Sequence, residues 1–151
     1  MGLTHVTVRV LPLASSRKFF DGEFLVDTGA IDCLADGRLL KKIGVRVEGK
    51  DVYELANGKT VEYNYGFVRV VFMGSETVTR IIFGPKDIEP ILGVVALEST
   101  GIGVDPVSKI LKRMAAKPLK QLFPWSFEVL DPAGGFCQAA RRRDVRAVEG
   151  A

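Results

Sequence analysis

The chain has 151 residues, of which 47% are hydrophobic, enough for one domain with its own core, and no apolar run approaches the roughly 20 residues that span a bilayer. The formal net charge of +3 is uneven, because residues 1–108 carry 12 bases and 14 acids, or −2, whereas residues 109–151 carry 9 bases and 4 acids, or +5. These properties argue against a disordered or membrane-spanning chain and place the basic excess in its C-terminal part.

The first predicted elements form a hairpin. Residues 4–13 alternate, with Val6, Val8 and Val10 on one face, and predict a strand. Because the N-terminus alternates in this way, it lacks the apolar run of a signal peptide, and we expect a cytoplasmic protein. Polar turns at residues 15–18 and 21–22 precede a returning strand over residues 23–26.

The returning strand ends in an acid. Three apolar residues, Phe24 to Val26, run directly into the sequence Asp27-Thr28-Gly29-Ala30. A carboxylate at the end of a buried strand is costly unless it is hydrogen-bonded or paired, which favours a functional acid. Asp-Thr-Gly also makes an ordinary turn, so these three residues alone leave both interpretations open.

A short strand and a helix are predicted next. Residues 31–34 are mainly apolar and predict a strand, in which Cys33 is a small core residue. Asp36 is placed to cap a helix over residues 37–43 that ends at Gly44.

Hairpins fill the middle of the sequence. Residues 51–72 predict a long hairpin, with strands over residues 52–55 and 60–63 joined by Ala56-Asn57-Gly58-Lys59. Asn-Gly between strands is a strong hairpin signal, because both residues tolerate positive φ. Residues 66–73 and 77–83 predict two further strands around Gly74-Ser75.

A second apolar block follows at residues 90–97, with the sequence Pro-Ile-Leu-Gly-Val-Val-Ala-Leu. We expect Ile91-Leu92-Gly93 to cross close to the Asp-Thr-Gly loop, where a side chain at Gly93 would clash. Residues 94–100 predict two helical turns that end at Gly101. Residues 102–104 predict a strand, and Ile110-Leu111 predicts one more short strand.

Together the two blocks resemble those of a known family. The sequence Leu25-Val26-Asp27-Thr28-Gly29-Ala30, followed downstream by Ile91-Leu92-Gly93 and a short helix, resembles the single-lobe, retropepsin-like aspartic proteases over roughly residues 4–107. The resemblance implies a mainly β, closed, barrel-like acid protease fold with one or two short helices, acting as a homodimer. It also implies an aspartyl protease, that is, a hydrolase that cleaves peptide bonds.

The resemblance assigns roles to residues. Asp27, Thr28 and Gly29 would be catalytic, and Ala30 would pack behind them and help bind substrate. The hairpin tip Ala56-Asn57-Gly58 would be the flap that closes over substrate. Asp32 would contact the substrate backbone, although Ile31 stands where viral members carry an acid, so a solvent-facing Asp32 is an equal alternative.

The expected mechanism needs two carboxylates that share one proton, one accepting a proton from water and the other donating one. Asp-Thr-Gly occurs once, no Asp-Ser-Gly is present, and the chain is too short for a two-lobed enzyme. A C2 homodimer would supply the second Asp27. No metal or cofactor is expected, since the single His5 excludes a histidine cluster and also disfavours serine or cysteine catalysis. Two cysteines, Cys33 and Cys137, do not suggest a disulfide framework.

An alternative function is a catalytically inactive, dimeric β module that binds peptide or protein partners in the same cleft. A weaker alternative is nucleic-acid binding by two basic runs, at residues 109–120 and 141–146, but no aromatic residue is interleaved within either run to stack on bases.

The expected domain organisation is a protease domain over residues 1–107 and a basic C-terminal extension over residues 108–151. Within the extension, Phe123, Trp125 and Phe127 are expected to dock on the core, and residues 131–151 are expected to be partly disordered.

Overall fold

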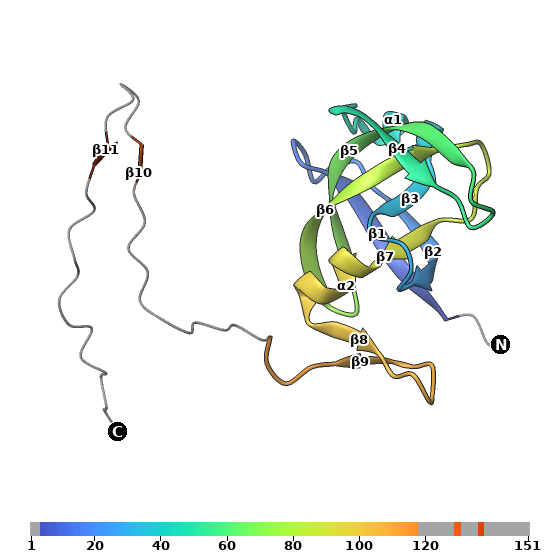
Figure 1. Ribbon diagram of the computed structural model, residues 1–151, viewed down its shortest axis with the longest axis vertical. Helices are drawn as coiled ribbons and strands as arrows, with labels where there is room; N and C mark the ends of the chain where they lie inside the picture. The colour runs from blue at the N-terminus through green and yellow to red at the C-terminus, as the bar shows by residue number, and fades with distance from the viewer. Residues whose placement is uncertain (1–3, 118–128, 131–135, 138–151) are drawn as a thin grey trace. The chain divides into compact units, whose positions relative to one another are not determined.

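The structure is a computed structural model that describes residues 4–117, 129–130 and 136–137 (Figure 1). The chain falls into two units, Met1–Lys117 and Pro118–Ala151. In the second unit, strands β10 (Val129–Leu130) and β11 (Phe136–Cys137) pair antiparallel. The expectations for Phe123, Trp125, Phe127 and the basic run at residues 141–146 concern residues outside the described ranges.

The first unit is mainly β and is built on one seven-stranded sheet with the strand order β1-β2-β7-β3-β6-β5-β4. Additional pairing of β1 with β5 closes all of these strands except β4 into a barrel (Figure 1), which confirms the predicted mainly β, closed, barrel-like architecture. The strands are β1 (His5–Pro12), β2 (Phe20–Asp27), β3 (Cys33–Asp36), β4 (Gly49–Glu54), β5 (Thr60–Phe72), β6 (Ser75–Gly84) and β7 (Ile91–Gly93).

The interior of the barrel follows the period-two pattern of the strands. On β1, Val8 and Val10 are fully buried, while the residues that alternate with them, Thr7 and Arg9, are exposed. On β5, Val68 and Val70 are buried in the same way. Because successive side chains of a strand point to opposite faces, this alternation fixes which face lines the core. Cys33 is completely buried, as its apolar context predicted.

Two short helices, α1 (Gly37–Ile43) and α2 (Val94–Thr100), match their predicted bounds. Both end at a left-handed glycine, Gly44 or Gly101, whose amide bonds back to carbonyls of the last turn. In Figure 1 the two helices lie at opposite ends of the barrel. An antiparallel pair formed by β8 (Ile102–Val104) and β9 (Leu111–Arg113) follows α2.

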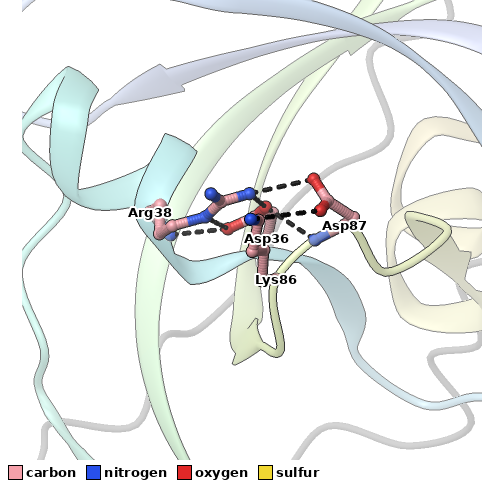
Figure 2. A network of polar contacts seen from close by, with 4 residues as sticks. All are labelled: Asp36, Arg38, Lys86 and Asp87. Atoms are coloured by element: carbon pink, nitrogen blue, oxygen red, sulfur yellow. Dashed lines mark hydrogen bonds and ion pairs between the residues drawn. The ribbon is translucent and has the colours of Figure 1, made fainter.

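The start of α1 is fixed by a buried acid. Oδ1 of Asp36 accepts a hydrogen bond of 2.8 Å from the Arg38 amide, and Oδ2 accepts bonds from the Arg38 guanidinium at 2.7 Å and from the Asp87 amide at 2.9 Å (Figure 2). Arg38 also donates to the Asp87 carboxylate. These bonds, led by that of Arg38, hold the pKa of Asp36 far below its usual range. Asp36 therefore joins β3, α1 and the loop before β7.

Several predicted boundaries were wrong. The polar turn predicted at residues 21–22 lies inside β2, and the strand predicted over residues 52–55 is β4 at Gly49–Glu54. The strand predicted at residues 31–34 is β3 at Cys33–Asp36, because Ile31 is 69% exposed and lies in a bend. The segments predicted as separate strands, residues 60–63 and 66–73, form the single strand β5. Within the described residues, no helix is long and apolar enough to cross a membrane.

Candidate active site

Asp27 is the last residue of β2, where that strand lies beside β7. The two strands run parallel, and Asp27 is in register with Gly93. The side chain is half-buried, and its Oδ1 accepts a hydrogen bond of 2.8 Å from the amide of Gly29. This is the only side-chain hydrogen bond that Asp27 makes within the described residues. A carboxylate held by a backbone amide keeps a defined orientation at the end of the strand.

The loop after Asp27 is joined to the start of α2. The Ala30 amide donates to the Asp27 carbonyl at 3.2 Å, which closes a tight turn. The amide of Val94 donates to the Ala30 carbonyl at 2.8 Å, and that of Val95 donates to the Ile31 carbonyl at 3.4 Å. Since the first amides of a helix lack intrahelical partners, these contacts satisfy them and fix the loop at the same time.

Gly93 is in close contact with that loop. A Cβ added at Gly93 would lie 2.5 Å from the carbonyl oxygen of Asp32 and 2.6 Å from that of Ile31. Both are backbone atoms, which cannot move aside as a flexible side chain would. The predicted clash is therefore present, two to three residues beyond the Asp-Thr-Gly sequence itself.

A cleft of about 690 Å³ lies beside the loop. One wall is the segment Gly29–Asp32, and the opposite wall is β4 with the start of its turn, from Asp51 to Leu55. Its volume lies within the range of ligand-binding pockets. The other residues that line it come from β3, β5, β6 and β7, namely Leu34, Tyr63, Arg80, Ile82 and Ile91.

The polar part of the cleft is centred on Asp32. Its Oδ2 accepts a hydrogen bond of 3.2 Å from the Tyr53 hydroxyl and lies 4.0 Å from Nε of Arg80. Arg80 also bonds the Asp51 carboxylate at 3.0 Å and stacks over the Tyr65 ring at 4.0 Å. Burial raises the pKa of Asp32, and the hydrogen bond from Tyr53 and the charge of Arg80 oppose that rise.

The β4–β5 hairpin ends in a tight turn at the predicted flap tip. The Gly58 amide donates to the Leu55 carbonyl at 2.8 Å, and the Lys59 amide donates to Oδ1 of Asn57 at 3.0 Å. Gly58 has φ of +78°, which an L side chain rarely adopts. Ala56, Asn57 and Gly58 are all exposed.

The structure brings only some of the predicted site residues together. Gly29, Ala30 and Asp32 line the cleft, whereas Asp27 and Thr28 lie at the loop outside its lining, and the tip Ala56-Asn57-Gly58 lies beyond the lining of β4. Thr28 is exposed. Sequence reasoning missed Tyr53 and Arg80. A signal for Arg80 was present, since it is the one base in the predicted strand over residues 77–83.

Other chemistry finds little support in the described part of the chain. Burial raises the pKa of the Cys33 thiol to about 11, which disfavours the reactive thiolate. Within residues 4–117, 129–130 and 136–137, no group of three or more His, Cys, Asp or Glu side chains is placed to hold a metal ion.

No family model and no curated protein matches the sequence. Among solved structures, 129 chains match. One is described as the structure of the foamy viral protease-reverse transcriptase in complex with RNA/DNA hybrid, with a TM-score of 0.49 and 16% sequence identity. The match covers 63% of this chain and 11% of that chain, so it spans about a tenth of the length of the viral protein. This is a weak likeness of overall shape.

Proposed function

We propose that the chain is a retropepsin-like aspartic endopeptidase that acts as a homodimer. The observation that carries the proposal is the placement of Asp27. It stands half-buried at the end of β2 beside Gly93 of β7, with its carboxylate oriented by the Gly29 amide, next to a cleft of about 690 Å³. An acid in this position would be available for proton transfer to a peptide that extends from the cleft over the end of β2.

Two Asp27 carboxylates, one from each subunit, share a proton in the proposed mechanism. The ionised carboxylate accepts a proton from a water that attacks the peptide carbonyl carbon, and the protonated one donates to the carbonyl oxygen. Two like charges at such short range cannot both ionise readily, so the pair divides into acid and base. A two-fold axis beside Asp27 would produce this pair from one sequence.

Apolar surface near Asp27 supports the dimer. Ile31 is 69% exposed and Val95 is 44% exposed, and the backbones of these two residues are hydrogen-bonded to each other. Large apolar side chains that are exposed together often mark an interface, because covering them removes apolar surface from water. A second copy placed against the Asp27 loop would cover both.

The remaining residues take positioning and binding roles in the proposal. Thr28, exposed beside Asp27, bonds across the dimer axis and holds the two loops together, while the Gly29 carbonyl faces the substrate backbone. Ala30 and Asp32 contact substrate from one wall of the cleft, and the tip Ala56-Asn57-Gly58 closes from the other. We assign residues 1–107 to the peptidase domain and residues 108–151 to a basic extension whose first strand, β9, pairs with β8.

A second candidate function is peptide binding without catalysis. The observation that favours it is that the cleft is already formed in a single chain and that Asp27 is absent from its lining. Such a module would bind an extended peptide between residues 29–32 and β4, and would retain that binding when Asp27 is replaced.

Cleavage of an unfolded polypeptide tests the choice between these functions. Purified protein should cut a denatured protein at internal bonds, best at acidic pH, with the products identified by mass spectrometry. Asp27→Asn should abolish cleavage and keep the fold. The control variant Asp21→Asn, on the same strand, should still cleave. Equal cleavage by Asp27→Asn would contradict the proposal, and peptide binding without any cleavage would support the second function.

Subunit mixing tests the shared site. When excess Asp27→Asn protein is added to the unaltered protein, mixed dimers that contain one Asp27 should form, and activity should fall as their fraction rises. An enzyme active as a monomer would keep its activity in this mixture. Sedimentation at the assay concentration would give the oligomeric state directly.

A further inference from the structure

A second hollow, of about 520 Å³, lies where the segment before β2 meets α1. We call it the basic hollow. Its charged lining consists of Arg17, Lys18 and Lys42. Its apolar lining consists of Phe19, Phe20, Leu39 and Ile43. It shares no lining residue with the cleft beside Asp27.

The cations of the basic hollow have no anionic partner in the part of the chain that the structure describes. Among the described residues, Arg17, Lys18 and Lys42 take part in no salt bridge, although other exposed bases such as Arg9 and Lys50 are paired with acids. Of the residues with a described placement, no acidic one lines the hollow. Three positive charges around one concavity repel one another and create a positive potential that an anionic ligand would neutralise.

The apolar part of the basic hollow is held in place. Leu39, Lys42 and Ile43 lie at spacings of three and four on α1, so they share one face of that helix. Phe19 is 45% exposed, and the guanidinium of Arg9 stacks over its ring at 4.1 Å. Arg9 is in turn fixed by two hydrogen bonds to Asp21, at 2.7 and 2.9 Å. An exposed aromatic ring fixed in this way can accept a side chain at little cost in conformational entropy.

We infer that the basic hollow binds an acidic peptide segment that carries an aromatic or branched aliphatic side chain. The acids would face Arg17, Lys18 and Lys42, and the apolar side chain would pack against Phe19 and Leu39. The choice of a peptide as the occupant depends on the proposed peptidase function, for which the hollow would be a docking site on a protein substrate.

The position of the basic hollow suits docking away from the reaction. Phe20 begins β2 and Asp27 ends it, so seven residues of strand, about 23 Å, separate the hollow from the reacting acid. A substrate could therefore dock an acidic segment at one end of the barrel and present another segment to the cleft. The chain's own extension is a poor occupant, since residues 109–151 carry 9 bases and 4 acids.

Nucleic acid fits the basic hollow less well. Proteins bind phosphate backbones with grooves of basic residues that follow the strand, whereas here three cations share the lining with four apolar side chains, which do not bind phosphate. A single-stranded oligonucleotide is nevertheless the appropriate competitor in the test, because Phe19 offers one aromatic face.

The test uses the full chain carrying Asp27→Asn, which prevents cleavage of the probe. The probe is a labelled peptide in which one Phe lies between two pairs of Glu, and its binding is followed by fluorescence anisotropy. Lys42→Glu should weaken binding by about fivefold or more, because it replaces an attraction with a repulsion. Lys41→Glu is the matched control, since it changes the same last turn of α1 outside the hollow, and it should change binding by less than about twofold.

A second pair of variants tests the apolar contact. Phe19→Ala should weaken binding by about tenfold, as expected for an aromatic contact at the centre of an interface. Phe67→Ala, at an aromatic residue that is 39% exposed on β5, should have little effect. Probe peptides with Ser in place of Phe, or Gln in place of Glu, should each bind more weakly than the original. Circular dichroism and thermal melting verify that every variant is folded.

The inference is wrong if Lys41→Glu and Lys42→Glu weaken binding of the probe peptide equally. It is also wrong if the oligonucleotide binds more tightly than the peptide and loses affinity when Lys42 is replaced. Binding of the Ser and original probes with equal affinity would show non-specific attraction to charge and would also overturn it. None of these outcomes bears on whether the unaltered protein cleaves peptide bonds, so failure here and failure of the peptidase proposal are distinguished.

Discussion

Asp27 and Gly93 are the last residues of two parallel strands and lie directly side by side. Gly93 is also the residue from which α2 begins, and the first amides of that helix bond the carbonyls that follow Asp27. The acid, its loop and the helix therefore form one unit with a single set of backbone contacts. Disturbing any backbone atom of this unit should displace the carboxylate.

Gly93→Ala tests how tightly this unit is packed. The new Cβ would lie 2.5 Å from a backbone oxygen of Asp32, so the loop or β7 must shift. We expect a loss of about 3 kcal/mol in the free energy of unfolding, measured by urea denaturation, and loss of peptidase activity. Gly103→Ala is the control, since a Cβ there meets nothing within 4 Å. If both variants were equally stable, the close approach at Gly93 would be refuted.

Gly58→Ala tests the role of the β4–β5 hairpin. Gly58 has φ of +78° with open space around its Cα, so the substitution introduces backbone strain of about 1 kcal/mol and no clash. Gly74 in the β5–β6 turn has φ of +73° and equally open surroundings. The two alanine variants should therefore lose similar stability.

Only the Gly58 variant should alter catalysis, because Gly58 lies in the turn next to the cleft wall Asp51–Leu55, whereas among the described residues the turn at Gly74 contributes nothing to the lining of the cleft. We expect kcat/KM for peptide cleavage to fall several-fold in Gly58→Ala and to stay near the original value in Gly74→Ala. Equal kinetics in the two variants would show that the hairpin tip does not close over substrate.

Asp32→Asn tests the polar wall of the cleft. Asparagine keeps the shape and can still accept the Tyr53 hydrogen bond, but it removes the negative charge. If Asp32 binds the substrate backbone, KM should rise by about tenfold or more, as expected for the loss of a charge-assisted hydrogen bond of about 1.5–3 kcal/mol, while kcat stays unchanged. A fall in kcat with constant KM would instead assign Asp32 to the chemical step.

The pH dependence of stability should have opposite signs at Asp36 and Asp32. The pKa of Asp36 is lower in the folded state than in the unfolded state, so the unfolded state binds more protons as the medium becomes acidic. The stabilising contribution of ionised Asp36 is complete when the pH is above its pKa in the unfolded state, about 3.9. It is lost as the pH falls through its pKa in the folded state. Comparing urea midpoints of the unaltered protein and Asp36→Asn should show a difference that shrinks below about pH 4.

Asp32 behaves in the reverse way, because burial raises its pKa in the folded state. Protonated Asp32 therefore stabilises the folded state. This contribution is complete when the pH is below the pKa of Asp32 in the unfolded state, and it is lost as the pH rises through the pKa of Asp32 in the folded state. The Asp32→Asn variant should therefore gain stability relative to the unaltered protein as pH rises. A difference that is constant with pH would contradict the buried setting of this carboxylate.

Elements with local signals were predictable from sequence. Asp36 caps the N-terminus of α1, and Gly44 ends the helix. Both effects depend on interactions between residues that are close in sequence, and the predicted bounds of α1 were correct. The contact of Gly93 with the Asp27 loop was predictable for another reason, since two ordered blocks of sequence resembled those of a family with a known arrangement.

Long-range packing was not predictable in the same way. Residue 66 was predicted to begin a separate strand, but β5 passes through Gly66 without interruption. A Cβ at Gly66 would lie 2.4 Å from the carbonyl oxygen of Arg46, so glycine is needed there for close approach and not for a turn. The contact between Asp32 and Arg80 likewise joins residues far apart in sequence, and no local pattern determines such a pair.

Pairing of β1 with β5 sets an order of events during synthesis. Pro12 pairs with Val68, so the barrel cannot close until the later strand has left the ribosome. At translation rates of about 5–20 residues per second, the time between synthesis of β1 and synthesis of its partner residues in β5 is about 3–12 s. During this time the nascent β1–β2 hairpin exposes the face that carries Val8 and Val10, and chaperones that bind short apolar segments should engage it then and release it once β5 arrives.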